Sequence, residues 1–268
     1  MVPPLRAQKE RLDRLVVIHG LAESRESAVR AILAGDVSVD GTVVDKPAKL
    51  VAHDARINVA LPPPYVSRAG EKLAAALSDF LINPSDSVCL DVGCSTGGFT
   101  DCLLQRGAKR IYAVDVGYGQ IHWRLRQDTR VILLERTNIR YVDRSTISER
   151  IGLAVLDVSF ISLALVLPSV VGLLADEAKV IALVKPQFEV GKGNVGAGGI
   201  VRDDAQRERA VRAVVESAKK LGLSFSNRCE SPLKGRKGNR EILVAFDYRS
   251  RISLEKDLSA SSRTKGEA

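Results

Sequence analysis

Two lysines and two acidic residues occupy positions from which a folded chain could gather their side chains into one site. Asp157 and Lys185 each end an apolar run of strand length. Glu241 comes directly before another such run, and Lys72 lies in the first turn of an expected helix. Ligands of parallel sheets bind beyond the carboxyl ends of the strands, where such residues can act together. Two amines and two carboxylates in one crevice could polarise or deprotonate a hydroxyl group.

A lysine removes a proton from a hydroxyl group only when the lysine itself is neutral. The pKa of such a lysine must fall from about 10.4 towards neutrality. Burial and a second lysine nearby lower the pKa, whereas neighbouring carboxylates orient the amine and oppose the fall. The residue types therefore leave open whether Lys72 or Lys185 is the base. Each residue taken singly also has a structural interpretation, such as a helix cap at Asp157.

A glycine-rich segment at residues 90–100 reads LDVGCSTGGFT, after an apolar run and before a helical pattern. Its glycines permit positive φ and a close approach of the backbone to a ligand. The next apolar run ends before Asp115, whose carboxylate can accept hydrogen bonds from ribose hydroxyls. The segment has the place and composition of a cofactor loop in a doubly wound α/β fold. An ordinary glycine-rich turn is the alternative.

The spacing of this loop differs from the G-x-G-x-x-G pattern of dinucleotide-binding folds. An acidic residue, Asp91, stands two positions before the first glycine and would repel a pyrophosphate. A cationic sulfonium cofactor with an amino-acid moiety meets no such repulsion. The loop resembles motif I of the S-adenosylmethionine-dependent methyltransferases.

The elements that must position these residues follow from the apolar pattern of the main part of the chain. Strands are expected at 88–92, 111–116, 153–158, 180–185 and 242–246, and helices at about 70–81, 98–106, 162–174 and 203–221. Near-continuous apolar strands that alternate with helices indicate an α/β domain with a mostly parallel sheet covered on both faces.

A smaller α+β unit is expected over residues 1–61. Helical patterns at 8–19 and from Ser24 to Gly35 precede a hairpin at 37–44, whose turn is Asp40-Gly41, and a strand at 56–60. Residues 62–66 begin with three prolines and form the predicted linker. The main domain then spans 67–249, and the polar tail 250–268 is expected to be disordered.

Four segments combine into a more specific pattern. They are SRAGEKL at 67–73, DVSFIS at 157–162, VKPQFE at 184–189 and GNRE at 238–241. Together they resemble the Lys-Asp-Lys-Glu set of the FtsJ-like ribose 2′-O-methyltransferases and, among these, the TlyA family. The resemblance covers nearly the whole chain as far as Tyr248. It implies a Rossmann-like class I methyltransferase domain behind a small RNA-binding domain.

The resemblance also implies a role for each residue. Lys185 acts on a ribose 2′-hydroxyl, while Lys72, Asp157 and Glu241 position and tune it. The cofactor S-adenosyl-L-methionine is held by Asp91, Gly93, Ser95, Gly97, Gly98, Phe99, Asp115, Asn138 and Asp157. The substrate implied is rRNA in ribosomal subunits, at a cytidine of the small or the large subunit. Such a ribose is not accessible in folded RNA, so the target nucleotide is expected to be unstacked or flipped into the crevice.

Residues 8–51 resemble the S-four-type RNA-binding domain, on the segments RLD at 11–13, GLAESR at 20–25 and GDVSVDG at 35–41. RNA contacts are expected from Arg11, Arg14, Arg25, Arg30, Lys46 and Lys49, and from Arg236 and Lys237 in the main domain. Residues 1–65 hold nine basic and eight acidic residues, and the rest of the chain holds 31 and 24. The excess of positive charge therefore belongs to the main domain, whose catalytic face is expected to contact RNA.

Composition excludes several classes of function. The chain has four cysteines, none of them in a C-x-x-C pair, and three histidines. This composition argues against a metal site and against a disulfide framework. The longest apolar stretch, 161–174, is too short to span a membrane and contains Pro168. With no apolar signal in residues 1–8, a cytoplasmic location is expected. A membrane-active hemolysin, the other activity attached to the family, and an RNA-binding assembly factor with a degenerate site are the alternatives.

Overall fold

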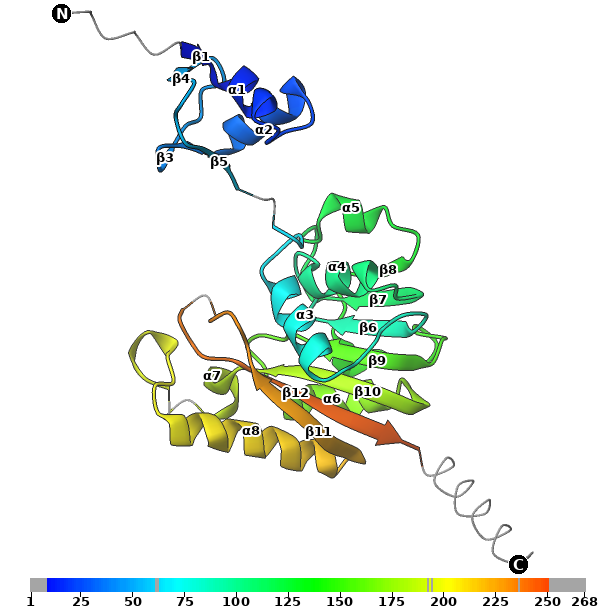
Figure 1. Ribbon diagram of the computed structural model, residues 1–268. Coiled ribbons are helices and arrows are strands. Elements are labelled where there is room, and N and C mark those ends of the chain that lie inside the picture. The colour runs from blue at the N-terminus through cyan, green and yellow to red at the C-terminus, as the bar shows by residue number, and fades with distance from the viewer. Residues whose placement is uncertain (1–8, 61–62, 192, 194, 236, 251–268) are drawn as a thin grey trace, which may run out of the picture. The chain divides into compact units, whose positions relative to one another are not determined.

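The computed structural model describes residues 9–60, 63–191, 193, 195–235 and 237–250. Contacts divide the chain into two compact units, Met1–Pro63 and Pro64–Ala268 (Figure 1). The division falls inside the run of three prolines at 62–64. The predicted tail lies outside the described residues, apart from Ser250.

Unit 1 is a small α+β domain. Its elements are β1 (Lys9–Arg11), α1 (Leu12–Ile18), α2 (Arg25–Ala34), β2 (Val37–Val39), β3 (Thr42–Val43), β4 (Leu50–Ala52) and β5 (Ile57–Val59). The strands pair as β1–β4 and as the three-stranded sheet β3-β2-β5. Apolar residues of both helices, including Leu12, Leu15 and Ile32, are fully buried against these strands. Each helix thus buries one face, as its periodicity predicts.

Local signals in unit 1 act as expected, with one exception. The Ser24 hydroxyl accepts a hydrogen bond from Ser27 N at 3.2 Å and caps α2, which ends at Gly35 with φ of 80°. Asp40 and Gly41 form the turn of the hairpin, both at positive φ. The prediction of a helix from residue 8 was wrong for residues 9–11, because these residues pair with β4 instead.

Unit 2 is built on a seven-stranded sheet with the order β11-β12-β10-β9-β6-β7-β8. Its strands are β6 (Val88–Val92), β7 (Arg110–Val114), β8 (Val131–Leu134), β9 (Ile151–Leu156), β10 (Leu174–Val184), β11 (Leu223–Glu230) and β12 (Ile242–Arg249). Strands β8, β7, β6, β9 and β10 are parallel, and β12 runs antiparallel to both of its neighbours. This is the α/β fold that the sequence predicts.

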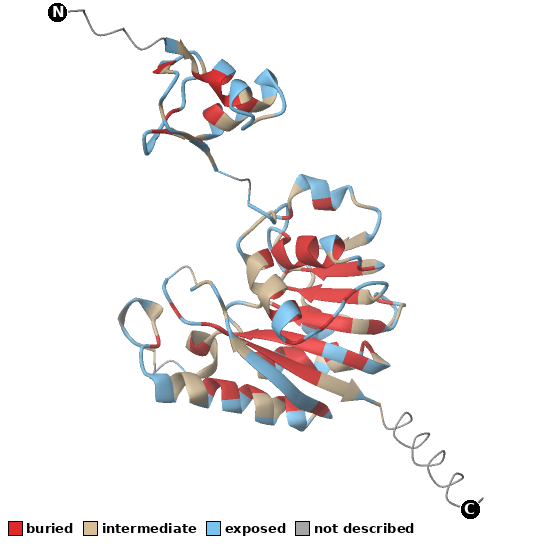
Figure 2. Cartoon of the chain, in the orientation of Figure 1, coloured by how far each residue is buried: buried red, intermediate tan, exposed pale blue. Residues whose placement is uncertain are grey.

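Helices cover both faces of the sheet (Figure 1). They are α3 (Ala69–Asp79), α4 (Gly98–Gln105), α5 (Trp123–Arg126), α6 (Leu163–Val171), α7 (Pro186–Glu189) and α8 (Asp204–Lys219), with the short 3-10 turns η1 (Ile139–Tyr141) and η3 (Ala197–Gly199). Apolar side chains of α3 and α4 pack on one face, and those of α6 and α8 pack on the other. The central strands are almost entirely buried in Figure 2, which explains their continuous apolar sequences. None of the described helices is long and apolar enough to cross a membrane.

The largest differences from the strands predicted in unit 2 are at β11, β8 and β10. β11 was missed because most of its residues are exposed, so it has no apolar run. β8 was missed because it is an edge strand of only four residues. β10 begins at Leu174, six residues before the predicted start. The prediction missed its first half because that half carries exposed charged residues. This early start also ends α6 at Val171.

The register of the sheet fixes which residues meet at its carboxyl edge. Val92 pairs with Leu156, and Leu156 pairs with Ala182. On the other side of β10, Val184 pairs with Ile242 of the antiparallel β12. The residue after β10 and the residue before β12 therefore emerge side by side.

Candidate active site

The carboxyl ends of β9 and β10 bring Asp157 and Lys185 into contact. Lys185 Nζ lies 2.6 Å from Asp157 Oδ1, and it donates a hydrogen bond of 2.9 Å to Ser159 Oγ. The two charged side chains are 11% and 18% exposed, so solvent screens their attraction only in part. Pro186 follows Lys185 and begins α7, which turns the chain sharply at the sheet edge.

A second ion pair joins Lys72 of α3 to Glu241. Lys72 Nζ lies 2.5 Å from Glu241 Oε2, and the side chains are 11% and 4% exposed. Glu241 directly precedes β12, so its pair lies beside the Lys185–Asp157 pair at the sheet edge. Four residues that are separated by up to 169 positions in the chain thus form two adjacent, shielded lysine–carboxylate pairs.

The glycine loop between β6 and α4 adjoins Asp157. Gly93 and Gly97 take φ of 84° and 94°, which only glycine adopts without strain. A Cβ on Gly93 would lie 2.7 Å from the Asp157 carbonyl oxygen, and Asp157 N donates to Val92 O at 2.9 Å. The glycine loop is therefore packed directly against the backbone of Asp157 at the carboxyl edge of the sheet.

Asp115 follows β7 and is held in a fixed orientation. Its Oδ2 accepts a hydrogen bond from Ser95 N at 2.8 Å, and its Oδ1 accepts one from Gly117 N at 2.7 Å. Each oxygen retains a further lone pair for ligand hydroxyls. Asn138 caps η1 by accepting from Arg140 N at 3.1 Å, directly after Thr137, whose N–H donates to Asp115 O. The glycines allow a ligand to approach the loop backbone closely, and the oriented carboxylate of Asp115 lies at the end of the next strand. This combination suits a cofactor that contains a ribose.

Asp91 is fully buried beneath the loop. Its Oδ2 accepts a hydrogen bond from Thr100 Oγ1 at 2.6 Å, and its Oδ1 has no hydrogen-bond partner in the described part of the chain. Burial raises the pKa of Asp91 from 3.8 to about 7, and the charge of Asp157 adds to the rise while the Thr100 bond opposes it. Asp91 has no exposed surface, so in this structure its carboxylate is covered by the loop above it.

Gly98 and Phe99, the first residues of α4, face the protein interior. A Cβ on Gly98 would lie 2.3 Å from Ser67 Oγ and 2.8 Å from Ala69 Cβ, so this glycine lets α3 approach α4 closely. The Phe99 side chain is 2% exposed and belongs to the core beneath α3 and α4. Both residues thus position α3, the helix that carries Lys72.

Several residues around the first ion pair carry signals that sequence reasoning did not use. Phe160 is 91% exposed at a φ of 65°, and the centroid of its ring lies 5.2 Å from that of Phe188 of α7, with the two rings tilted by 50°. Glu189 accepts hydrogen bonds from Ser162 Oγ at 2.6 Å and Leu163 N at 2.9 Å. Burial raises the pKa of Glu189. The segment after β9 is thereby tied to the segment after β10 at several points.

The arginines expected to bind RNA in unit 1 are partly organised by a buried acid. Arg11 and Arg25 each lie 2.9 Å from Asp13 Oδ2, whose side chain is fully buried. These guanidinium groups lower the pKa of Asp13 to about 2. Arg14 lies 3.7 Å from Glu10. Asp13 therefore holds two of the predicted cations at one place on the surface.

The loop that carries Lys46 and Lys49 packs on the start of α1. The carbonyl of Lys49 accepts from Leu12 N at 2.9 Å, and both lysine side chains are exposed. Lys46 and Lys49 thus lie near Arg11. In unit 2, Lys237 is exposed in the turn before Glu241, and Arg236 lies outside the described residues.

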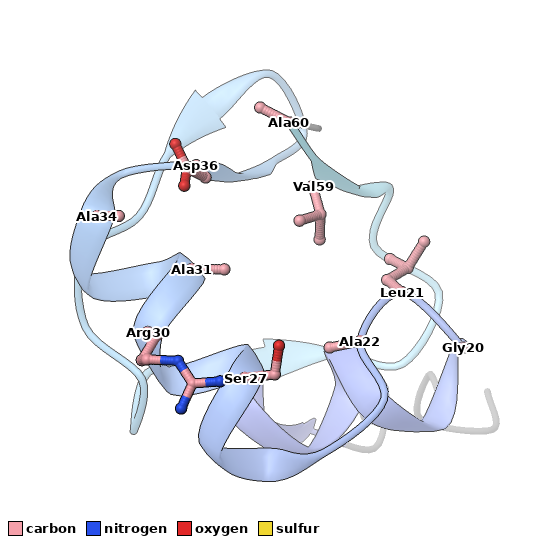
Figure 3. Close-up of a pocket in the computed structure, with 10 residues that line it drawn as sticks. All are labelled: Gly20, Leu21, Ala22, Ser27, Arg30, Ala31, Ala34, Asp36, Val59 and Ala60. Carbon is pink, nitrogen blue, oxygen red and sulfur yellow. The ribbon is translucent and has the colours of Figure 1, made fainter. Parts of the chain in front are cut away.

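Arg30 lies apart from these cations, at the rim of a hollow of about 560 Å³ in unit 1 (Figure 3). Ala31, Ala34 and Val59 supply its apolar floor, and Asp36 and Ser27 add polar groups. It contains none of the four ion-pair residues. No cluster of metal-ligating side chains occurs among the residues that the structure describes.

Comparison with known proteins decides the family. The FtsJ-like methyltransferase family matches residues 65–248, and the S4 domain matches residues 10–57. The chain is 48% identical over 240 residues to the 16S/23S rRNA (cytidine-2'-O)-methyltransferase TlyA of Mycobacterium tuberculosis, which covers 89% of this chain and 90% of that protein. The chain belongs to the TlyA family of FtsJ-like methyltransferases.

Other members of the TlyA family carry the hemolysin name. Hemolysin A of Brachyspira hyodysenteriae is 43% identical over 237 residues, which is 88% of this chain and 99% of that protein. A solved structure from Streptococcus thermophilus, also named for hemolysin, is 38% identical with a TM-score of 0.70. It covers 98% of this chain and 100% of that one. The S4 domain of the family corresponds to unit 1 and the methyltransferase domain to unit 2.

The buried Asp91 predicts an unusual dependence of stability on pH. Because its pKa is raised in the folded state, the folded protein retains a proton that the unfolded chain releases. Stability therefore falls as the pH rises from about 4 to about 7, by at most about 1.4 kcal/mol per pH unit. Asp91→Asn removes this loss, so its stability relative to the parent protein increases between pH 5 and pH 8.

Urea unfolding followed by the fluorescence of Trp123 measures this difference. Trp123 is the single tryptophan of the chain and lies in unit 2, so its emission reports the unit that contains Asp91. Asp79→Asn, in the last turn of α3, serves as the control for removal of one carboxylate. A difference between Asp91→Asn and the parent that is the same at both pH values would contradict the raised pKa.

Proposed function

We propose that this protein is an S-adenosyl-L-methionine-dependent rRNA methyltransferase that methylates the ribose 2′-hydroxyl of a cytidine in ribosomal subunits. One observation carries the proposal: two shielded lysine–carboxylate pairs adjoin a glycine loop in a chain of the TlyA family. Relatives named for this reaction supply the substrate class, and unit 1 supplies an RNA-binding domain.

The first ion pair suits work on a hydroxyl group. Ser159 Oγ accepts a hydrogen bond from Lys185 Nζ, and Asp157 lies in ion-pair contact with the same amine, so both hold it at the sheet edge where a substrate oxygen would reach it. In its neutral form, Lys185 would accept the hydroxyl proton while the substrate oxygen takes up the methyl group and the bond between that methyl group and the sulfonium sulfur breaks. The Asp157 carboxylate would stabilise the ammonium that results. The Lys72–Glu241 pair lies beside it at the edge of the sheet.

The cofactor would be held by the glycine loop, Asp115 and Asn138. When bound, it supplies a methyl group on a cationic sulfonium. Asp115 would accept from the ribose hydroxyls, and the loop backbone would approach the amino-acid end closely because Gly93 and Gly97 carry no side chain. The negative charges of Asp115 and Asp157, with that of Asp91 above its pKa, favour a cation at this edge.

The exposed ring of Phe160 suits an unstacked base. It lies three residues after Asp157 in a backbone conformation that disfavours bulky residues, and an exposed aromatic in such a conformation marks a functional position. The Phe160 ring also contacts the tilted ring of Phe188, which lies in the segment that follows Lys185. The ring would support the base of the nucleotide whose ribose reaches Lys185, as required for a ribose in folded RNA.

Removal of either partner of the first ion pair is expected to abolish methyl transfer. Lys185→Ala deletes the group that takes the proton, and Asp157→Ala deletes its counter-charge, so each lowers the rate by at least about 100-fold. Transfer of labelled methyl groups to purified ribosomal subunits measures the rate, and filter binding shows that both variants still bind the subunits.

Lys179→Ala is the matched control. Lys179 lies in β10, the strand that ends directly before Lys185, but it pairs with Asp247 at the surface, so its loss leaves the rate unchanged. Full methylation activity in Lys185→Ala or Asp157→Ala would remove the proposed mechanism.

The ring of Phe160 predicts a separate effect. Loss of one base–aromatic stack costs about 1–3 kcal/mol, so Phe160→Ala lowers kcat/KM for ribosomal subunits by about 5- to 150-fold. The affinity for S-adenosyl-L-methionine, measured by calorimetry, stays unchanged. Phe225→Ala, which truncates an exposed ring of the edge strand β11, is the control. An undiminished kcat/KM in Phe160→Ala would exclude a role of this ring in holding the base.

A further inference from the structure

Two loops far apart in the sequence are joined next to Glu241. The first is residues 196–201, at the end of a second glycine-rich segment that begins at Gly191, and here Gly196 and Ile200 form an isolated bridge. The second is a turn, of which the structure describes Gly235 and residues 237–239, and it leads into Glu241 and β12. The catalytic scheme above assigns no role to either loop.

Asn239 makes the connection. Its Oδ1 accepts a hydrogen bond from Val201 N at 2.9 Å, and its Nδ2 donates one to Gly199 O at 2.8 Å. Its backbone carbonyl accepts from Gly235 N at 2.9 Å, which closes the turn. Asn239 is only 2% exposed. A buried amide that satisfies both loops is costly to remove, because its partners would be left without hydrogen bonds.

The turn held by Asn239 lies against the carboxylate of Glu241. A Cβ on Gly235 would lie 2.4 Å from Glu241 Oε1, so the backbone of the turn forms the wall on that side. Lys72 holds the other oxygen, Oε2. The backbone of Glu241 is fixed as well, because its carbonyl accepts from Ser231 N at 2.9 Å. The position of this carboxylate thus depends on the position of the turn.

We propose that Asn239 is a positioning residue for methyl transfer. It anchors the turn that leads into Glu241 to residues 199–201, and it thereby fixes Glu241 and, through Glu241, Lys72. Asn239 touches neither Lys72 nor a reacting atom, so it acts through Glu241. The proposal rests on the proposed function for its kinetic consequence. The geometric part, that Asn239 keeps Glu241 on Lys72, stands without that function.

Kinetics on ribosomal subunits give the first test. Asn239→Ala lowers kcat by about 10- to 100-fold, the effect of misplacing one group of a catalytic set, and leaves KM for the cofactor and the subunits unchanged. Asn239→Asp keeps the acceptor for Val201 N and loses the donor for Gly199 O. Its kcat relative to the parent recovers as the pH is lowered, because a protonated carboxyl donates again. Asn227→Ala, an exposed asparagine of β11, is the control.

Acylation of lysines gives a second test that does not depend on methyl transfer. Lys72 is shielded by Glu241, so its rate of acetylation by acetic anhydride rises several-fold in Asn239→Ala. Lys185, which pairs with Asp157, is the internal reference and reacts as in the parent protein. Peptide mass spectrometry of the folded full-length chain measures both rates.

The outcomes separate the two proposals. A parent protein that methylates no ribosomal subunit, with faster acetylation of Lys72 in Asn239→Ala, removes the proposed function and keeps the positioning role. Unchanged kcat and unchanged acetylation of Lys72 in folded Asn239→Ala overturn the positioning role, as does a change confined to KM. Should Asn239→Ala fail to fold, Asn239→Asp decides, and a kcat ratio that is independent of pH counts against the proposal.

Discussion

The contact of 2.6 Å between Lys185 and Asp157 is possible only because two parallel strands, β9 and β10, end side by side. The rest of unit 2 depends on this edge. β6 on one side brings the glycine loop against Asp157, and the antiparallel β12 on the other side brings Glu241 beside Lys185. α3 then completes the set, since Gly98 lets it lie close to α4 with Lys72 on Glu241. A shift in the register of β10 against β9 would separate Lys185 from Asp157.

The distribution of charge agrees with a division of labour between the units. Unit 1 has almost balanced charge, and its buried Asp13 holds two arginines in one arrangement, which favours recognition of shape and phosphates over general attraction. The positive excess lies in the unit that contains the crevice. The acids at the crevice favour a cationic cofactor, while cations such as Lys237 nearby favour an RNA backbone.

Much of this arrangement could be predicted from the sequence, and the exceptions have physical reasons. The bounds of β6 are those predicted, because a strand buried on both faces is a continuous apolar run. β11 lacks such a run because it is exposed. The resemblance to the family predicts the site residues Lys72, Asp157, Lys185 and Glu241. It does not predict the role of Asn239, because the hydrogen bonds of Asn239 join residues 38 and 40 positions apart, and a single sequence carries no signal for such contacts. Likewise, composition shows few aromatic residues, and only the fold shows that Phe160 is exposed at the crevice.

In the proposed function, residues at the carboxyl edge of the sheet catalyse methylation of a ribose in rRNA. The most direct measurement is mass mapping of nucleotides from purified small and large ribosomal subunits after incubation with the protein and S-adenosyl-L-methionine. We expect one added methyl group on the ribose of a cytidine in one or both subunits, and none with Lys185→Ala. A methyl group on a base, or unmodified rRNA in subunits that bind the protein and its cofactor, would contradict it.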